Sequence, residues 1–149
     1  MTAAFSNELP EITFDNKCDR ADGWVPEKGW NGLIPAVSTL SEAMERLGAW
    51  QGSSQLLNGV VYDFCEGTVR ITVLEEEATI AKIWVSSSFQ GGALIPQTIE
   101  AARELFGTLK ATKLDVLQGE IFERPGLRIT CDPAPPPEKV RSLEFYRPG

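Results

Sequence analysis

The chain has 149 residues, 42% of them hydrophobic and 23% charged, and carries a net charge of −7. These values are typical of one globular domain and exclude a disordered chain. No apolar run approaches the roughly 20 residues of a membrane-spanning helix, so no transmembrane segment is expected. The start lacks the basic region and apolar core of a signal peptide, which predicts a cytoplasmic protein.

The excess of acidic residues is confined to the first 90 residues. Residues 1–30 carry six acids and three bases, residues 31–90 carry seven acids and three bases, and residues 91–149 carry eight of each. Such a surface repels nucleic acid and anionic membranes, so neither is expected as a partner, and it accelerates encounter with a basic protein. Acidity that serves solubility alone is the alternative interpretation.

The first 32 residues are rich in Gly, Asp, Asn and Pro, which predicts an irregular segment. Trp24 and Trp30 lie in it. Tryptophans in a loop either pin the loop to the core or present an aromatic surface to a partner. Both interpretations stay open at this point.

The three cysteines are Cys18, Cys65 and Cys131. They are widely spaced and odd in number, which favours reduced thiols, with one disulfide as the alternative in a secreted chain. The alternation of apolar residues places Cys131 in the core. It places Cys65 on the side opposite Phe64, where its thiol would be exposed.

Thr39 begins the first strongly patterned element. Thr39 and Glu42 have the spacing of a capping box, in which the hydroxyl accepts a hydrogen bond from an early N–H and the carboxylate accepts one from the cap residue. Apolar residues then recur at helical spacing as far as Leu47, and Gly48 stands where a helix commonly ends. The pattern predicts an amphipathic helix over 39–47.

Three strand-like runs follow a loop that contains QGSSQ. VVYDF leads to a turn at CEGT, VRITVL turns Arg70 away from its apolar residues, and TIAKIWV turns Lys82 and Trp84 to the same outward side. Ala81 is expected on the inward side. The acidic run Glu75–Glu77 links the second run to the third, so the helix is followed by an antiparallel meander.

The second half repeats the first at an offset near 60 residues. TLSEAMERLG at 39–48 returns as TIEAARELFG at 98–107, and LIP at 33–35 returns at 94–96. GTVRIT in the first half corresponds to GLRIT in the second. Agreement of several segments at one offset indicates an internal duplication.

These patterns predict a single α+β domain over residues 1–149. It would consist of an irregular N-terminal segment (1–32), a first repeat (33–90) and a second repeat (91–149). Each repeat would hold one helix and a three-stranded antiparallel meander. Both helices would pack on a mostly antiparallel sheet, because one helix and three strands cannot cover both faces of their own sheet.

A glycine-closed helix followed by a meander, with the unit duplicated, resembles the tandem-repeat fold of the beta-lactamase inhibitor protein. One unit is similar to the small outer-membrane lipoproteins that help to assemble membrane barrels. The resemblance covers 33–146 in its order of elements and implies recognition of a protein by a sheet surface, without any individual functional residue. In size and acidity the chain is also similar to bacterial immunity proteins, which plug the active site of a toxin.

The absence of histidine excludes Ser-His-Asp and Cys-His catalytic groups and histidine-ligated zinc. The sequence also lacks a phosphate-binding glycine loop, a dinucleotide fingerprint and a calcium-binding loop, so no cofactor and no metal are expected. Carboxylates can act as acid and base only where a cleft raises one pKa. Asp63 and Glu66 flank a hairpin turn, where side chains are usually solvated.

The candidate partner-binding residues are acids and aromatics expected on the surface: Trp50, Asp63, Glu66, Glu75, Glu76, Glu77 and Trp84. Aromatic anchors surrounded by charge are typical of protein interfaces. The alternative for Trp84 is that a helix covers its sheet face, and the alternative for Trp50 is a cap over the end of the helix.

The leading hypothesis is a non-catalytic inhibitor of the immunity type that neutralises a basic toxin or enzyme by occluding its active site. A structural or adaptor subunit, in which self-association is an option, is the first alternative. A carboxylate-dependent enzyme is the second.

Overall fold

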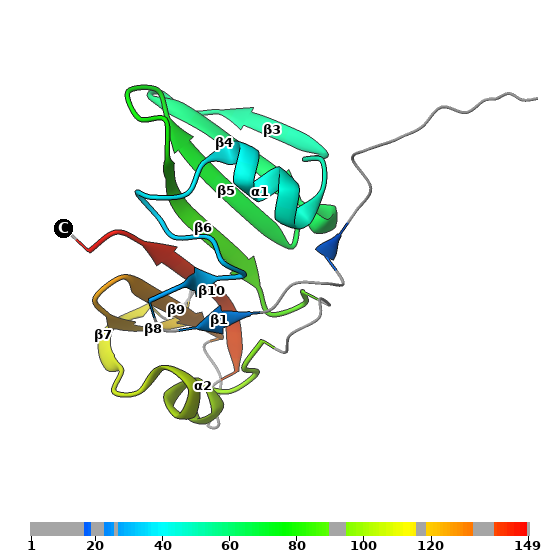
Figure 1. The fold of residues 1–149 in the computed structure, drawn as a ribbon. Coiled ribbons are helices and arrows are strands. Elements are labelled where there is room, and N and C mark those ends of the chain that lie inside the picture. Colours follow the sequence, from blue (N-terminus) through cyan, green and yellow to red (C-terminus); the bar gives the residue numbers. More distant parts are fainter. Residues whose placement is uncertain are drawn as a thin grey trace, which may run out of the picture.

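The computed structural model describes residues 17–18, 23–25, 27–89, 95–115, 119–132 and 139–148 (Figure 1). The helices within these ranges are α1 (Leu40–Leu47) and α2 (Ile99–Phe106), and a short 3₁₀ turn is η2 (Cys65–Gly67). The strands there are β1 (Trp24–Val25), β2 (Gly29–Trp30), β3 (Gly52–Gln55), β4 (Gly59–Phe64), β5 (Val69–Leu74), β6 (Ile80–Ser86), β7 (Lys110–Asp115), β8 (Gly119–Arg124), β9 (Leu127–Cys131) and β10 (Val140–Tyr146). Neither described helix is long and apolar enough to cross a membrane.

Eight strands form one antiparallel sheet in the order β3-β4-β5-β6-β10-β9-β8-β7, and β1 pairs with β2 in a separate hairpin. The predicted α+β class is therefore wrong, because the described chain is mostly β. The predicted three-stranded meander is also wrong, since each helix is followed by four strands. Pairing of β6 with β10 joins the two four-stranded halves into a continuous sheet.

The missed strands, β3 and β7, are the two edges of the sheet. β3 has the sequence GSSQ and its last three residues are exposed, while β7 has the sequence KATKLD. An edge strand pairs on one side only and needs no alternating apolar face, so hydrophobic periodicity does not detect it. Ala81 was also misplaced: a register shift pairs Val73 with Ile80 after Thr72 with Lys82, so Ile80 takes the buried position.

The predicted helix over 39–47 is confirmed in position and in its start signal. The Thr39 hydroxyl accepts a hydrogen bond from the Glu42 N–H at 3.2 Å, and the Glu42 carboxylate accepts one from the Thr39 N–H at 2.9 Å. Gly48 follows α1 with a positive φ of 94°, a conformation that favours glycine. The second helix begins in the same way, with the Thr98 hydroxyl accepting from the Ala101 N–H.

Both helices and the β1–β2 hairpin pack on the same side of the sheet, called here the covered face. Figure 1 shows α1 lying across β4 and β5. Its buried residues are Ala43 and Leu47. In the other half the Phe106 ring of α2 lies 6.1 Å from the Phe145 ring of β10. The hydrophobic core therefore lies between this face and the elements above it.

The segment before α1 is pinned to the core by its tryptophans. Trp30 is 1% exposed and its ring lies 5.4 Å from that of Phe89. Trp24 packs edge-on against Phe106 of α2, with ring centroids 5.0 Å apart. Of the two interpretations left open by the sequence, the structure supports pinning, and it gives this segment a short hairpin in place of the expected irregular chain.

Cys18 and Cys65 form a disulfide across 47 residues of sequence. Both side chains are buried, at 6% and 7% exposure. The predictions of reduced thiols at these two positions and of an exposed thiol at Cys65 are therefore wrong. η2 turns the chain back at this point, and Cys65 itself has a positive φ of 55°, so its side chain leaves the alternation of β4 and is buried. Cys131 is fully buried, as its alternation pattern predicts.

Reducing this disulfide should destabilise the fold. For a closed loop of this length the chain-entropy model gives about 4 kcal/mol of stabilisation. We expect the urea midpoint of the wild type to fall on addition of dithiothreitol, and that of Cys18→Ala/Cys65→Ala to be low and insensitive to it. A wild-type midpoint that reductant leaves unchanged would contradict the assigned bond.

Candidate protein-binding surface

The face of the sheet opposite the helices, called here the open face, carries the outward side chains of the alternation pattern. Four residues of β5 and β6 lie on it because their neighbours along the same strand fill the core: Arg70, Thr72, Lys82 and Trp84 face outward, and Val69, Ile71, Ile83 and Val85 are buried. The Arg70 and Lys82 side chains are 52% and 53% exposed. Trp84 is partly exposed and lies outside the buried core. The alternative prediction, that a helix covers the sheet face of Trp84, is therefore wrong for the described chain.

A single row of side chains crosses this face, with one residue from each of six neighbouring strands. In spatial order the open-face row is Asp63, Arg70, Trp84, Glu144, Arg128 and Glu123. Strand pairing places each residue directly opposite the next. At such positions opposite charges and aromatic pairs stabilise a sheet.

The first half of the row is held by Arg70. Its Nε lies 3.2 Å from the Asp63 carboxylate, and its guanidinium carbon lies 4.8 Å from the centroid of the Trp84 ring. A guanidinium this close to an indole is attracted by the negative face of the ring. Arg70 therefore contacts both Asp63 and the Trp84 ring, and it links the two residues across β5.

The second half of the row is held by Arg128. Its Nε lies 2.9 Å from Glu123 Oε2, and its Nη1 lies 3.7 Å from Glu144 Oε1. Lys82 Nζ reaches the other oxygen of Glu144 at 3.7 Å from the diagonal position on β6. Glu144, opposite Trp84, is thus bracketed by two cations from neighbouring strands.

The two halves of the row are nearly symmetric about the β6–β10 pair. Asp63 opposite Arg70 on β4 and β5 corresponds to Glu123 opposite Arg128 on β8 and β9. The symmetry breaks at the centre, where β6 contributes Trp84 and β10 contributes Glu144. The aromatic residue stands in the middle of the sheet, flanked on both sides by ion pairs.

The shortest ion pair in the row, between Arg128 and Glu123, shifts the pKa of both partners. The Arg128 guanidinium, with help from the Thr112 hydroxyl, holds the pKa of Glu123 below its ordinary value of 4.5. Glu123 in turn raises the pKa of Arg128. Both effects stabilise the ionised forms, so the pair is charged across the neutral range.

The predicted partner-binding residues do not form one patch. Asp63 and Trp84 share the open face through Arg70. Glu66 lies in η2, where its N–H donates to Gln51 Oε1 at 2.7 Å. η2 precedes β5 and the Glu75–Glu77 turn follows it, so the two lie at opposite ends of this strand. Glu66 and Glu75–Glu77 are exposed.

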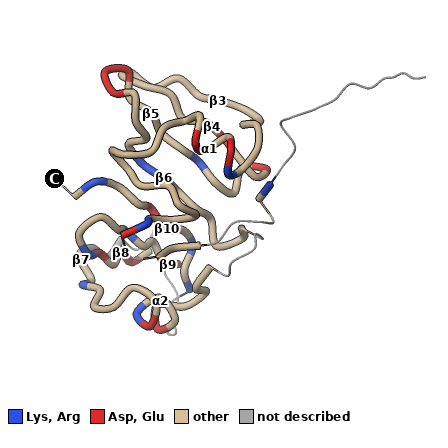
Figure 2. Tube along the Cα trace, in the orientation of Figure 1, with Lys and Arg blue, Asp and Glu red and all other residues tan. Residues whose placement is uncertain are grey.

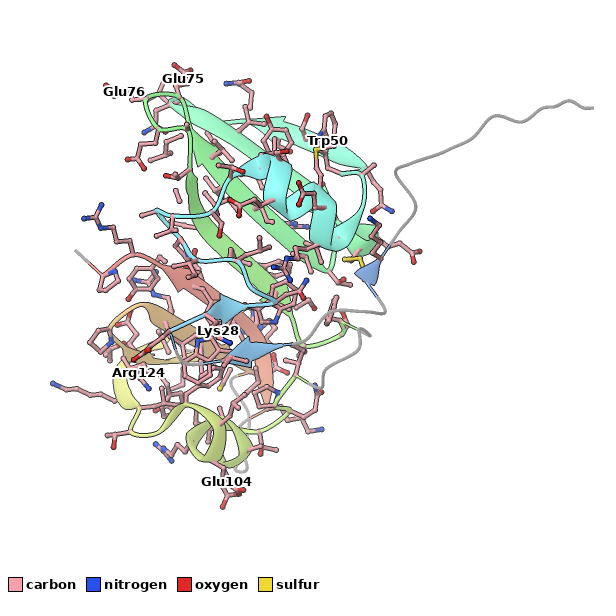
Figure 3. All side chains as sticks on the ribbon, in the orientation of Figure 1. Lys28, Trp50, Glu75, Glu76, Glu104 and Arg124 are labelled. Atoms are coloured by element: carbon pink, nitrogen blue, oxygen red, sulfur yellow. A yellow bond between two sulfur atoms is a disulfide. The ribbon has the colours of Figure 1, made fainter. Side chains whose placement is uncertain are left out.

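Trp50 lies apart from all of them. Its ring packs 5.2 Å from that of Tyr62, whose side chain points to the covered side, and it is 40% exposed. Figure 3 shows Glu75 and Glu76 at the β5–β6 turn, well separated from Trp50, and Figure 2 shows other acidic residues on the helices.

Sequence reasoning missed Glu123, Arg128 and Glu144 as members of the site. Arg128 had a usable signal, because GLRIT repeats the outward arginine of GTVRIT. The position of Glu144 opposite Trp84 depends on the pairing of β6 with β10, which are about 60 residues apart. No local pattern encodes that pairing.

The chain matches no protein-family model, no curated protein and no solved structure in the comparisons made. Among the described residues, no group of three or more Cys, Asp or Glu side chains is placed to hold a metal ion. The functional assignment therefore depends on the geometry of the sheet.

Replacing Glu123 tests the Arg128 ion pair. Because folding lowers the pKa of Glu123, its contribution to stability is complete above the ordinary value and is lost as the pH falls through the folded value. Glu123→Gln should lower the free energy of unfolding at pH 7 by less than about 1 kcal/mol, since the pair is partly solvated.

The difference between wild type and E123Q should shrink toward zero in urea titrations at successively lower pH. Glu120→Gln is the matched control, because Glu120 lies on the same strand and has no ion pair in the described chain. It should change the free energy of unfolding at pH 7 by less than E123Q does. A difference between wild type and E123Q that persists at pH 2 would show that the substitution acts by packing and not by charge.

Proposed function

We propose that this protein is a non-catalytic binding protein that docks another protein on the open face, with Trp84 as the central anchor. One observation carries the proposal: a partly exposed tryptophan stands in the middle of an eight-stranded sheet, on the side away from both helices. Tryptophan and arginine are the residues most enriched among those that dominate binding energy, and such residues cluster near the centre of an interface.

The row supports this role because it holds Trp84 in place before any partner binds. Arg70 contacts both the Trp84 ring and Asp63, so its position is fixed by two neighbours. An anchor that is already ordered loses little side-chain entropy on binding. The flanking ion pairs also satisfy each other's charges, so a partner that covers them buries few unpaired groups.

The specific form that we propose is inhibition of the immunity type, in which the partner is an enzyme whose active site is occluded. The row itself holds three acids and two bases, with Lys82 beside it, so it is nearly neutral. Part of the acidic excess of the first 90 residues lies outside the row, in the exposed Glu75–Glu77 turn that joins the end of β5 to the start of β6. A basic partner seated on the open face and extending over this turn would meet both features.

The protein and its partner must occupy the same compartment, and the cytoplasmic location stays a prediction. The disulfide between Cys18 and Cys65 speaks against the predicted cytoplasmic location, because structural disulfides are typical of oxidising compartments. A carboxylate enzyme is less well supported. Its general acid requires a raised pKa, and Arg128 lowers that of Glu123.

The first experiment is capture of the partner from a lysate or culture of the source organism with tagged wild-type protein, followed by affinity measurement with variants. Trp84→Ala should weaken binding by about 2 kcal/mol or more, which is roughly a thirtyfold rise in Kd. Trp50→Ala is the matched control, because Trp50 is an exposed tryptophan on the covered side, and it should leave Kd nearly unchanged.

Reversal of charge at Glu75, Glu76 and Glu77 tests the basic partner. The triple Lys variant should slow association by about tenfold at low salt with little change in dissociation, because exposed charges steer encounter. If the partner is an enzyme, wild type should inhibit it stoichiometrically and W84A should not. A partner bound equally well by wild type and W84A would place the docking surface elsewhere.

A further inference from the structure

The edge strand β3 lies in a long uncharged part of the chain. No Asp, Glu, Lys or Arg occurs over residues 47–62, although the protein carries 35 charged residues in total, 21 acidic and 14 basic. Exposed apolar side chains flank the strand, with Trp50 before it at 40% exposure and Leu57 after it at 101%. Uncharged, apolar-flanked edges invite pairing with another strand.

The free hydrogen-bonding groups of β3 follow from its register. The Leu56 N–H donates to the Gly59 oxygen at 2.8 Å, and β3 pairs Ser54 with Val61 and Gly52 with Asp63. The backbone groups of Leu56 therefore face β4. Alternate residues of a strand direct their N–H and C=O groups to the same side, so those of Ser54 and Gly52 face β4 as well. Those of Ser53 and Gln55 are directed away from the sheet.

The opposite edge of the sheet is built differently. β7 contains Lys110 and Lys113 and has a register shift between Ala111 and Lys113. Edge lysines and bulges are the features that prevent strands from pairing edge to edge. The β7 edge thus carries lysines and a register shift, and the β3 edge carries neither.

We propose that two copies of this chain associate through their β3 edges as an antiparallel pair with two-fold symmetry. Pairing Ser53 of each copy with Gln55 of the other uses the backbone N–H and C=O groups of both residues on both strands. This register places Ser54 of the two copies opposite each other on the axis. The sheets of the two copies then form one continuous sheet, and this arrangement holds whether or not the open face binds a partner.

Charge and shape both favour a second copy as the occupant. Each chain carries −7, so two copies repel, but salt screens charges that lie far apart, and the repulsion is weakest where the uncharged 47–62 segments meet. In the proposed register Gly52 stands opposite Leu56 of the second copy. An ideal Cβ at Gly52 would have only an Asp63 oxygen nearby, at 3.5 Å, so the space above it is open to that side chain.

Cysteine cross-linking tests the register directly. Directly opposed residues in a non-hydrogen-bonded antiparallel pair have Cα atoms about 4.5 Å apart, within the range that a disulfide spans. Ser54→Cys should therefore form a disulfide-linked dimer under mild oxidation. Ser53→Cys, one residue away and on the other face, is the matched control and should cross-link far less. Cys131 is fully buried and the other two cysteines form the disulfide, so the introduced thiol is the accessible one.

Proline at Ser53 tests the edge without the cysteines. The Ser53 N–H is directed away from β4, and proline is tolerated at such positions of edge strands. In sedimentation equilibrium over a concentration series, wild type should dimerise and Ser53→Pro should raise the dissociation constant by about tenfold or more. Circular dichroism should show that S53P keeps its fold. Wild type that stays monomeric throughout, or equal cross-linking of S53C and S54C, would overturn the proposal.

Discussion

The pairing of β6 with β10 is the interaction on which the rest of the structure depends. Five residue pairs join these strands, and they run down the centre of the eight-stranded sheet. On the covered face, Val85 meets Leu143 and Ile83 meets Phe145, so the cores of the two halves become one. On the open face the same pairing puts Trp84 opposite Glu144. Core and candidate site are therefore two sides of one contact.

The two halves dock their helices on this sheet by the same backbone contacts. The Ile80 N–H donates to the Ser38 oxygen at 2.8 Å before α1, and the Val140 N–H donates to the Gln97 oxygen at 2.9 Å before α2. Each helix is thus tied to the last strand of its own meander, which leaves the other face of the sheet open.

Gly119 begins β8 with a φ of 101° and lies so close to the Cys131 oxygen that no side chain fits there.

Local signals in the sequence predict the parts of this structure that depend on near neighbours. Thr39 and Glu42 predict the start of α1, because the capping box lies within four residues. The alternation in VRITVL and IWV predicts that Arg70 and Trp84 face outward. The class of the fold, the disulfide and the complete row could not be predicted, because they depend on distant contacts. Cys18 meets Cys65 across 47 residues, and β3 and β7 carry no apolar alternation.

The most direct test of the central claim is oxidative footprinting of the protein alone and bound to its captured partner, read at individual tryptophans by mass spectrometry. Trp84 and Trp50 are both reachable by solvent in the free protein, on opposite sides of the sheet. The open-face account predicts that the partner protects Trp84 and leaves the oxidation of Trp50 unchanged. Protection of Trp50 with undiminished oxidation of Trp84 would contradict it and move the binding surface to the side that carries the helices.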